Sequence, residues 1–329
     1  MARYVLVATM KNEGPHLLEW VAHHKRLGFD DIIIFQNGST DFTDRSLQVM
    51  DKAGIVQYHL NEFRPNFQNP PYQNRALRRA SHTEAYQNAD WCIGLDGDEF
   101  LHIKTPEGTL DSLVSAVEQR AGEVDEIRLN WRLFGNSFLD SFDERMMTER
   151  FTWADRDDLV TTRMIPVKTL FRTKSFLRPG IHLPKEPQKE TLRFSNGSGL
   201  PQEAFETSGF RSLDPGQRAF AQINHYAVRD IESFLLKSAR GSASNVGRQV
   251  NMQYWNRFNY NQVEDTGLRD LMPKTVDEMA VLDDLTNGRL MGIRRRSFRQ
   301  WRVGVRQLRE EPEFAKLHRR LASQKSQAA

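Results

Sequence analysis

The chain has 329 residues, 39% of them hydrophobic and 27% charged, which is typical of a folded globular protein and not of a disordered one. No apolar run is long enough for a transmembrane helix, and the first residues lead directly into a strand-like segment without the features of a secretory signal. The single cysteine, Cys92, excludes an internal disulfide framework and a cysteine-based zinc site. We therefore expect a cytoplasmic protein.

The first hundred residues alternate between strand and helix patterns. Continuous apolar runs predict strands, and apolar residues that recur every three or four positions predict helices. Strands are expected over residues 4–8, 31–35, 55–59 and 91–95, and helices over 15–28, around Leu47 and Met50, and over 73–88. Strands separated by helices imply βαβ units and a mostly parallel sheet. The first loop has neither a Gly-x-Gly-x-x-Gly nor a Walker sequence, so dinucleotide and P-loop sites are not expected.

Three carboxylates follow the strand expected at 91–95. Asp96, Asp98 and Glu99 come directly after the apolar run, with a glycine between the two aspartates. Ligands of open α/β sheets bind beyond the carboxyl ends of the strands, and paired carboxylates there suit a divalent cation that also holds phosphates. An acidic turn without a ligand is the alternative, because Asp and Gly are common turn residues.

The second half of the chain is less regular until its basic end. Strands are expected over 126–132, 166–171 and 219–226, and helices over 110–117 and 230–240. Between Arg289 and Leu321, eleven Lys and Arg stand against three Glu, and apolar residues recur there with helical spacing. We therefore divide the chain into a domain of residues 1–270, with a nucleotide-binding half (1–105) and an acceptor-side half (106–270), and a basic helical extension of residues 271–329.

Several of these segments resemble one known family. In their order and spacing they are similar to the bacterial family 2-like glycosyltransferases of GT-A type, in the branch that is also similar to glycosyltransferase family 92. The segments are Lys11-Asn12-Glu13, Leu18-Glu19-Trp20, the loop from Asn37 to Asp41, Leu95 to Leu101, Trp131 to Gly135, and Asn224-His225-Tyr226 with Phe234, Lys237, Arg240 and Gly241. The resemblance covers residues 3–270. It implies a GT-A fold, an α/β, Rossmann-like architecture with a mostly parallel central sheet and flanking helices, here with a helical C-terminal extension.

The resemblance also implies a nucleotide-sugar donor, usually UDP-linked, and Mn²⁺ or Mg²⁺. Asp98 would bind the metal directly and so be catalytic, while Asp96 would face the ribose or a metal-bound water. His225 would be a further metal ligand, with a satisfied core histidine as the alternative.

Two loops would flank the donor's base and ribose according to the same resemblance. One loop contains Asn12 and Glu13, and the other contains Gln36 and Asn37. The family often has an Asp at the position of Gln36, so the identity of the base is left open.

The reaction itself indicates further candidates. The leaving diphosphate gains negative charge, so Lys237 and Arg240, one turn apart on the helix expected at 230–240, are candidates to bind it, with a plain solvated helix face as the alternative. Inverting transfer, which the family suggests, also needs a base for the acceptor hydroxyl. Glu186 is our choice, and Trp131 and His182 are expected on the acceptor side. The other carboxylates in the acceptor-side loops are Asp155, Asp157 and Asp158.

We therefore predict a metal-dependent glycosyltransferase of hexosyltransferase type that acts on a glycan or lipid-linked acceptor in polysaccharide biosynthesis. A nucleotidyltransferase is one alternative, although residues 9–14 lack the glycine- and arginine-rich loop that it needs. The other alternative is a non-catalytic protein that binds anionic ligands or a membrane surface. No nucleic-acid partner is expected, and peripheral contact with the inner face of a membrane through the basic helices is weighed against a solvated basic face.

Overall fold

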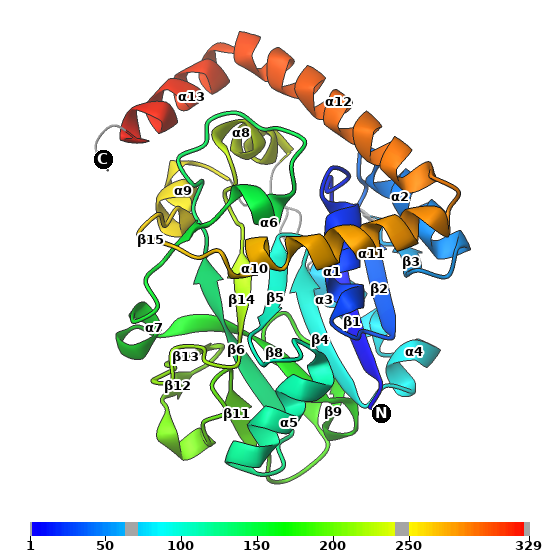
Figure 1. Ribbon diagram of the computed structural model, residues 1–329, viewed down its shortest axis with the longest axis vertical. Helices are drawn as coiled ribbons and strands as arrows, with labels where there is room; N and C mark the ends of the chain where they lie inside the picture. Colours follow the sequence, from blue (N-terminus) through cyan, green and yellow to red (C-terminus); the bar gives the residue numbers. More distant parts are fainter. Residues whose placement is uncertain (1, 63–71, 241–249, 326–329) are drawn as a thin grey trace.

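The first strands of the chain pair in parallel at one end of a large mixed sheet (Figure 1). The computed structural model describes residues 2–62, 72–240 and 250–325, so Gly241 of the family resemblance lies outside it. The strands are β1 (Tyr4–Met10), β2 (Asp31–Gln36), β3 (Gln57–Leu60), β4 (Trp91–Asp96), β5 (Glu99–Ile103), β6 (Glu126–Leu133), β7 (Trp153–Ala154), β8 (Ile165–Arg172), β9 (Phe176–Arg178), β10 (Lys185–Pro187), β11 (Phe194–Asn196), β12 (Thr207–Ser208), β13 (Arg211–Ser212), β14 (Ala221–His225) and β15 (Val263–Glu264).

Helices flank this sheet and continue to the end of the described chain. They are α1 (Leu17–Arg26), α2 (Thr43–Lys52), α3 (Tyr72–Ala80), α4 (Glu84–Gln87), α5 (Leu110–Ala121), α6 (Met147–Arg150), α7 (Leu159–Thr162), α8 (Ile231–Arg240), α9 (Met252–Phe258), α10 (Gly267–Asp270), α11 (Met272–Asp284), α12 (Arg289–Glu310) and α13 (Pro312–Lys325). Among the described residues, no helix is both long and apolar enough to cross a membrane.

The sheet order is β3-β2-β1-β4-β8-β6-β14-β5. Strands β3 to β4 are parallel, β8 runs antiparallel to both β4 and β6, and β14 is parallel to β6 but antiparallel to β5. The α/β class with a largely parallel sheet, flanking helices and helices at the C-terminal end is confirmed.

Alternate residues of the central strands face two different cores. On β1, Leu6 belongs to a large core that includes side chains of α1, α2 and α11, whereas Val7 belongs to a smaller core with Ala76 and Leu77 of α3. Both faces of these strands are therefore covered, which explains why their sequences are apolar without interruption.

The strand register brings distant polar residues to one edge of the sheet. Thr9 at the end of β1 pairs with Asp96 at the end of β4, and His225 at the end of β14 pairs with Glu99 at the start of β5. The acidic turn between β4 and β5 therefore lies beside the ends of β1 and β14, where α/β sheets bind ligands.

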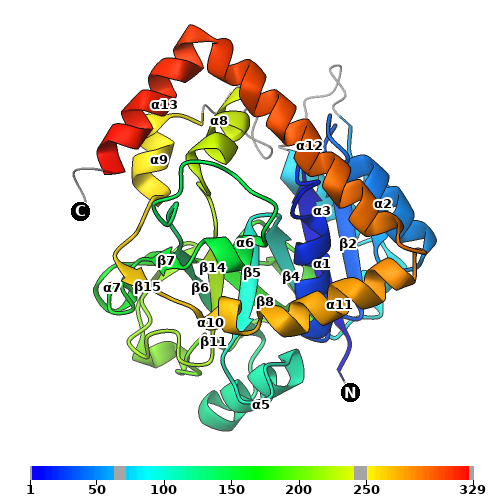
Figure 2. The same ribbon diagram turned by 45° about the horizontal axis from the view of Figure 1, so that its top comes forward.

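The C-terminal helices pack onto the rest of the fold. Figures 1 and 2 show α12 and α13 along the outside of the molecule, with α12 beside α2 and α8, and α13 beside α8. Leu290 and Ile293 of α12 and Leu321 of α13 are buried in the same large core as the helices of the sheet. Gln300 of α12 donates a hydrogen bond from Nε2 to the carbonyl oxygen of Thr40, in the loop after β2 (3.1 Å).

Several elements differ from the sequence-based prediction, and helices α9 and α10 are among those that were not predicted. The helix expected over 73–88 is interrupted, because Thr83 adopts an extended conformation and its side chain accepts a hydrogen bond from the N–H of Tyr86, so that a second helix, α4, begins. Strand β5 and helix α11 were not predicted. Strand β5 lies so close to the acidic turn that its apolar residues read as part of the same segment.

Buried histidines make the stability of this fold sensitive to acid. His16, just before α1, is almost fully buried, and its ring packs edge-on against Phe298 and Trp301 of α12 (ring centroids 6.0 and 5.6 Å apart). Burial, with Arg229, Arg294 and Arg150 adding to it, lowers the pKa of His16 well below its usual value. An unfolded histidine takes up a proton below about pH 6.5, whereas the folded one does not, so the contribution of His16 to stability is lost progressively as the pH falls below that value.

We therefore expect His16→Phe to reduce the acid sensitivity of the fold. Relative to the wild type, its free energy of unfolding should rise as the pH falls from about 7 to about 5, by up to about 1.4 kcal/mol per pH unit. Urea denaturation at several pH values measures this. The control is His82→Phe at an exposed histidine, and parallel stability profiles of His16→Phe and the wild type would contradict the prediction.

Candidate active site

The acidic turn is held rigidly between β4 and β5. The carboxylate of Glu99, fully buried, accepts a hydrogen bond from the N–H of Asp96 (2.8 Å). Burial raises the pKa of Glu99. The ammonium group of Lys168, on β8, lies 3.1 Å from the carboxylate and acts in the opposite direction, lowering this pKa. A Cβ atom on Gly97 would lie 3.1 Å from Cγ of Glu13, so the glycine permits the close approach of the loop after β1.

A cavity of about 180 Å³ opens at this turn. It collects residues from β1, β4, β6, β14, α3, α8 and α9 and from loops, including the connection between β9 and β10. The lining residues are Thr9, Met10, Lys11, Glu13, Gln73, Asp96, Gly97, Asp98, Trp131, Ile181, His182, His225, Val250, Lys237, Arg240, Tyr254 and Phe258. Most of the candidate site residues chosen from the sequence therefore line one cavity.

Asp98 lies at the centre of the charged part of this cavity. One carboxylate oxygen is 2.8 Å from Nζ of Lys237, and the other is 3.7 Å from Nε2 of His225. Although burial opposes its ionisation, Lys237, together with His225 and Arg229, lowers the pKa of Asp98 far below its usual range. Asp98 is therefore a carboxylate at every physiological pH.

His225 is a neutral imidazole beside that carboxylate. Burial lowers its pKa to about 4, against the opposing effect of Asp98. Its Nδ1 is buried and has no hydrogen-bond partner among the described residues, and the same is true of Nε1 of Trp131, whose ring packs 4.3 Å from the imidazole. Buried polar atoms are rarely left unpaired, so these two point to a site that takes a ligand.

Asp96 has different neighbours from Asp98. One oxygen accepts a hydrogen bond from Nε2 of Gln73 (2.6 Å), and the other is 3.0 Å from Nζ of Lys168. The two aspartates of the turn thus each face a lysine, and both keep lone pairs for a further partner.

The loop after β1 is tied to α8 by a second set of ion pairs. Glu13 contacts Arg229 at 2.7 Å and Arg240 at 3.0 Å. Arg240 also donates to backbone carbonyl groups of Lys11 and Asn12. Asn12 adopts a left-handed conformation (φ 55°) and lines a neighbouring cavity together with Gln300 and Trp301 of α12.

Besides Asn12, three residues chosen from the sequence do not line the main cavity. Gln36 and Asn37 are buried and support the loops, since Gln36 accepts from the N–H of Ser39 (2.8 Å) and Asn37 from Nδ2 of Asn61 (2.7 Å). Glu186 lies on β10, half-exposed, and pairs with Arg178 at 2.7 Å. The structure does not bring Glu186 to the cavity, because β10 pairs with β9 and holds it in that hairpin.

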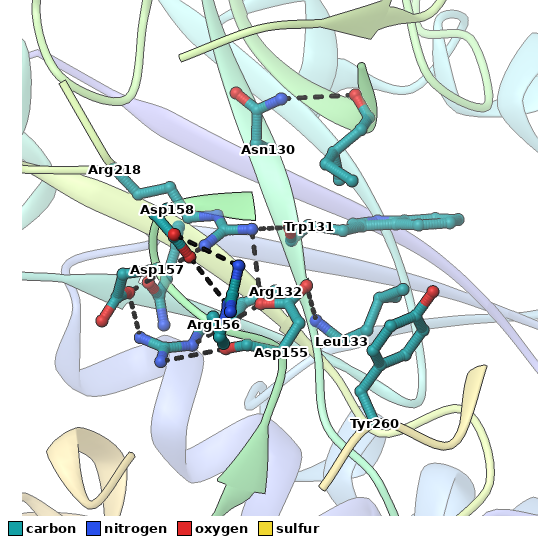
Figure 3. A network of polar contacts seen from close by, with 12 residues as sticks. Asn130, Trp131, Arg132, Leu133, Asp155, Arg156, Asp157, Asp158, Arg218 and Tyr260 are labelled. Carbon is teal, nitrogen blue, oxygen red and sulfur yellow. Dashed lines mark hydrogen bonds and ion pairs between the residues drawn. The ribbon is translucent and has the colours of Figure 1, made fainter. Parts of the chain in front are cut away.

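The other acceptor-side carboxylates belong to a separate set of polar contacts beside Trp131, in which Asp155 is buried while Asp157 and Asp158 are exposed (Figure 3). Asp155 is fully buried, 3.4 Å from the guanidinium of Arg218, which also donates to the carbonyl oxygen of Trp131 (3.1 Å). Arg132 pairs with Asp157 at 2.6 Å and with Asp265 at 2.8 Å. This network holds the strand that carries Trp131.

Sequence reasoning missed several lining or supporting residues. Lys168 interrupts the apolar run expected at 166–171. A charged residue within a buried strand needs a partner of opposite charge, so Lys168 could have indicated a buried ion pair. Gln73, Arg229 and Tyr254 had no comparable signal, because their neighbours come from remote parts of the chain.

The donor set fits a divalent ion in part. Among the described residues there is no group of three or more His, Cys, Asp or Glu side chains placed to hold a metal. Asp98 and His225 nevertheless offer an anionic oxygen and a neutral nitrogen 3.7 Å apart, close enough to share one ion, with Asp96 nearby. Mn²⁺ and Mg²⁺ commonly complete their coordination with phosphate oxygens and water.

Comparison with known proteins assigns the family. The family model of glycosyltransferase family 92 matches residues 7–226. The chain belongs to glycosyltransferase family 92. The resemblance stated from the sequence and the enzyme class that it implied are thereby confirmed at the level of the family, and the matched region contains Asp96, Asp98, Trp131, His182 and His225 but not α8 or the helices after it.

Relatives within family 92 are longer than this chain. A family 92 protein of Ricinus communis is 26% identical over 281 residues, which are 79% of this chain and 45% of that protein. A family 92 protein of Oryza sativa subsp. japonica is 28% identical over 156 residues, 46% of this chain and 25% of that protein. The match thus covers about half the length of the first relative and a smaller share of the second.

Two solved structures are similar to part of this chain. The S. aureus protein TarS (residues 1–349), in complex with UDP-GlcNAc, has 15% sequence identity and a TM-score of 0.31, with 52% of this chain and 46% of that chain covered. Glucosyl-3-phosphoglycerate synthase of M. tuberculosis has 18% identity and a TM-score of 0.28, with 40% and 45% covered.

Proposed function

We propose that this chain transfers a sugar from a UDP-linked donor to a glycan or a lipid-linked acceptor, with a divalent cation at Asp98 and with inversion at the sugar. The observation that carries the proposal is the cluster of Asp98, His225 and Lys237 at the carboxyl edge of the sheet. It combines a carboxylate that stays ionised, a neutral imidazole and a partly buried ammonium group in one cavity within or next to the region matched to family 92.

The cations of α8 are suited to bind the donor diphosphate. Lys237 is partly buried, and although this opposes its charge, Asp98 raises its pKa, so it is an ammonium group at neutral pH. Arg240 lines the same cavity one turn along the helix. Fixed cations at this place stabilise the charge that develops on the departing diphosphate.

Asp98 and His225 would hold the metal ion, with Asp96 nearby. When bound, such an ion acts as a Lewis acid on the phosphate oxygens. Lys168 and Gln73 fix the carboxylate of Asp96, which keeps it in place toward the cavity for the ribose or for water. The loop at Asn12 and Glu13 is held against α8 and would border the nucleoside.

Calorimetric titration of UDP into the protein, with Mn²⁺ and then with EDTA, tests the proposal. Binding that requires Mn²⁺ supports it. Failure of UDP, GDP, CMP and TDP to bind in either condition would overturn it. Binding of a nucleotide other than UDP would change only the proposed identity of the donor.

The outer face of α12 supports a further part of the proposal, namely contact with an anionic membrane surface on the cytoplasmic side. Arg295, Arg296, Arg299 and Arg306 are exposed and form no ion pair with the residues that the structure describes. Val303, 53% exposed, lies among them. A stripe of arginines that are not paired with acidic residues attracts anionic lipid head groups.

We expect the protein to sediment with vesicles of phosphatidylcholine and phosphatidylserine but not with phosphatidylcholine alone. Changing Arg295, Arg299 and Arg306 to Gln should weaken this binding about 100-fold, because each basic residue near an anionic surface contributes about 1 kcal/mol. The control changes three exposed arginines elsewhere, Arg145, Arg156 and Arg269, to Gln. Equal sedimentation with both kinds of vesicle, or with neither, would contradict membrane contact.

A further inference from the structure

The proposed transfer needs a group that takes the proton of the acceptor hydroxyl, and the carboxylates of the cavity are poorly suited to this. Among the described residues, Glu13, Asp96 and Asp98 are the carboxylates that line it. Each is bound to at least one cation: Glu13 to Arg229 and Arg240, Asp96 to Lys168, and Asp98 to Lys237. In the proposed function Asp98 and Asp96 are also engaged by the metal ion and the donor, so these carboxylates already have other partners.

His182 lines the same cavity and has a free ring nitrogen. Its Nδ1 lies 2.9 Å from the carbonyl oxygen of Val167. A carbonyl oxygen only accepts hydrogen bonds, so Nδ1 carries the proton and Nε2 carries the lone pair. No described residue makes a hydrogen bond to this Nε2.

The imidazole of His182 is also fixed in place. Its ring is stacked on Phe210, with centroids 4.3 Å apart and an interplanar angle of 15°, and it contacts the ring of Trp131 at 5.4 Å. Thr169 donates a hydrogen bond from its hydroxyl to the carbonyl oxygen of His182 (2.8 Å). Burial, with Lys168 adding to it, lowers the pKa of His182 to about 4, so the ring is neutral at pH 7.

Trp131 links His182 to the residues on the proposed metal side. Its ring contacts that of His225, which faces Asp98, and it also contacts the ring of His182. An inverting transfer needs a base on the side of the sugar opposite the leaving diphosphate, and the proposal below assigns His182 to that side.

We propose that Nε2 of His182 is the catalytic base. The oxygen of the acceptor hydroxyl forms a bond to the anomeric carbon, and the bond from that carbon to the phosphate oxygen breaks, with its electron pair leaving on the nucleoside diphosphate. The hydroxyl proton passes to Nε2 and is later released to water. This inference rests on the proposed function and names the residue that completes it.

His182→Asn is the variant that tests this role. Its side-chain N–H₂ can replace Nδ1–H as the donor to Val167, while the basic lone pair is lost. We expect UDP to bind as tightly as in the wild type, within about twofold, while the rate of UDP release from UDP-sugars falls about 100-fold to 10,000-fold. The control is His59→Asn, a half-buried histidine stacked on Phe35 (5.0 Å) and outside the cavity.

The outcomes are distinguishable. Loss of turnover with UDP binding retained supports the base, and a His182→Asn variant with wild-type turnover overturns it. A wild-type protein that neither binds UDP nor releases it from any UDP-sugar overturns the proposed function, and the role of His182 with it.

A second measurement does not depend on activity. Nitrogen chemical shifts of ¹⁵N-labelled histidine, assigned to His182 with the Asn variant, report which ring nitrogen carries the proton. A neutral ring protonated at Nδ1 at about pH 7 is expected. A ring protonated at Nε2 would overturn the proposal, because no lone pair would then face the acceptor.

Discussion

Asp98→Asn should lower the affinity for UDP in the presence of Mn²⁺ by about 10-fold to 100-fold and turnover by about 1,000-fold. The amide keeps the size of the side chain but removes the negative charge that Lys237 and His225 face. Without that charge a cation is held less tightly, and Lys237 is no longer positioned by its ion pair. Calorimetry with Mn²⁺ measures the first effect, and UDP release from the donor measures the second.

The matched control is Asp158→Asn. Asp158 is exposed and pairs with Arg156 on the surface (3.1 Å), so its loss should change neither UDP affinity nor stability by more than about 0.5 kcal/mol. In EDTA, Asp98→Asn and the wild type should bind UDP with similar affinity. An Asp98→Asn variant that binds UDP with Mn²⁺ like the wild type would refute the role of this carboxylate.

Arg218→Met should lower the free energy of unfolding by about 3–5 kcal/mol. Arg218 is fully buried, and its removal leaves the carboxylate of Asp155 in the core with fewer cationic partners (Figure 3). Burial already raises the pKa of Asp155, and Arg218 is the first of the groups that oppose this. Urea denaturation at neutral pH measures the loss, which is large against the about 5–15 kcal/mol that stabilises a typical domain.

A second substitution separates this charge effect from lost packing. In Arg218→Met with Asp155→Asn, the buried carboxylate is gone, so the loss should be smaller than the sum of the two single losses. Arg156→Met, which breaks an exposed ion pair, should cost less than about 1 kcal/mol. Additive losses would show that Asp155 and Arg218 are not coupled.

Local sequence patterns predicted the frame of the site well. The apolar runs of β1, β2 and β4 identified strands covered on both faces, and the abrupt change to Asp96 and Asp98 marked the edge of the sheet at which the candidate site lies. These features depend on residues that are neighbours in sequence, which is why they can be read without a structure.

The partners of those carboxylates could not be predicted in the same way. Lys168 reaches Asp96 only because β8 inserts antiparallel beside β4, and nothing within either strand specifies that pairing. Glu186 was chosen because it follows His182 closely, yet the β9–β10 hairpin turns it toward Arg178. His182 itself was placed on the acceptor side, but its tautomer depends on the carbonyl of Val167 in a different segment.

The position of α12 has a consequence for how the enzyme is made. Ser297 of α12 lies close to Gly14, because a Cβ atom added to Gly14 would be 2.8 Å from the hydroxyl oxygen of Ser297. Gln300 of α12 binds the loop after β2. A ribosome synthesises these loops long before α12. The strands can fold as they emerge, but the loops after β1 and β2 gain the contacts with α12 only once that helix has been made. A nascent chain should therefore acquire the proposed affinity for UDP only after α12 has emerged, in one step, and not gradually with length.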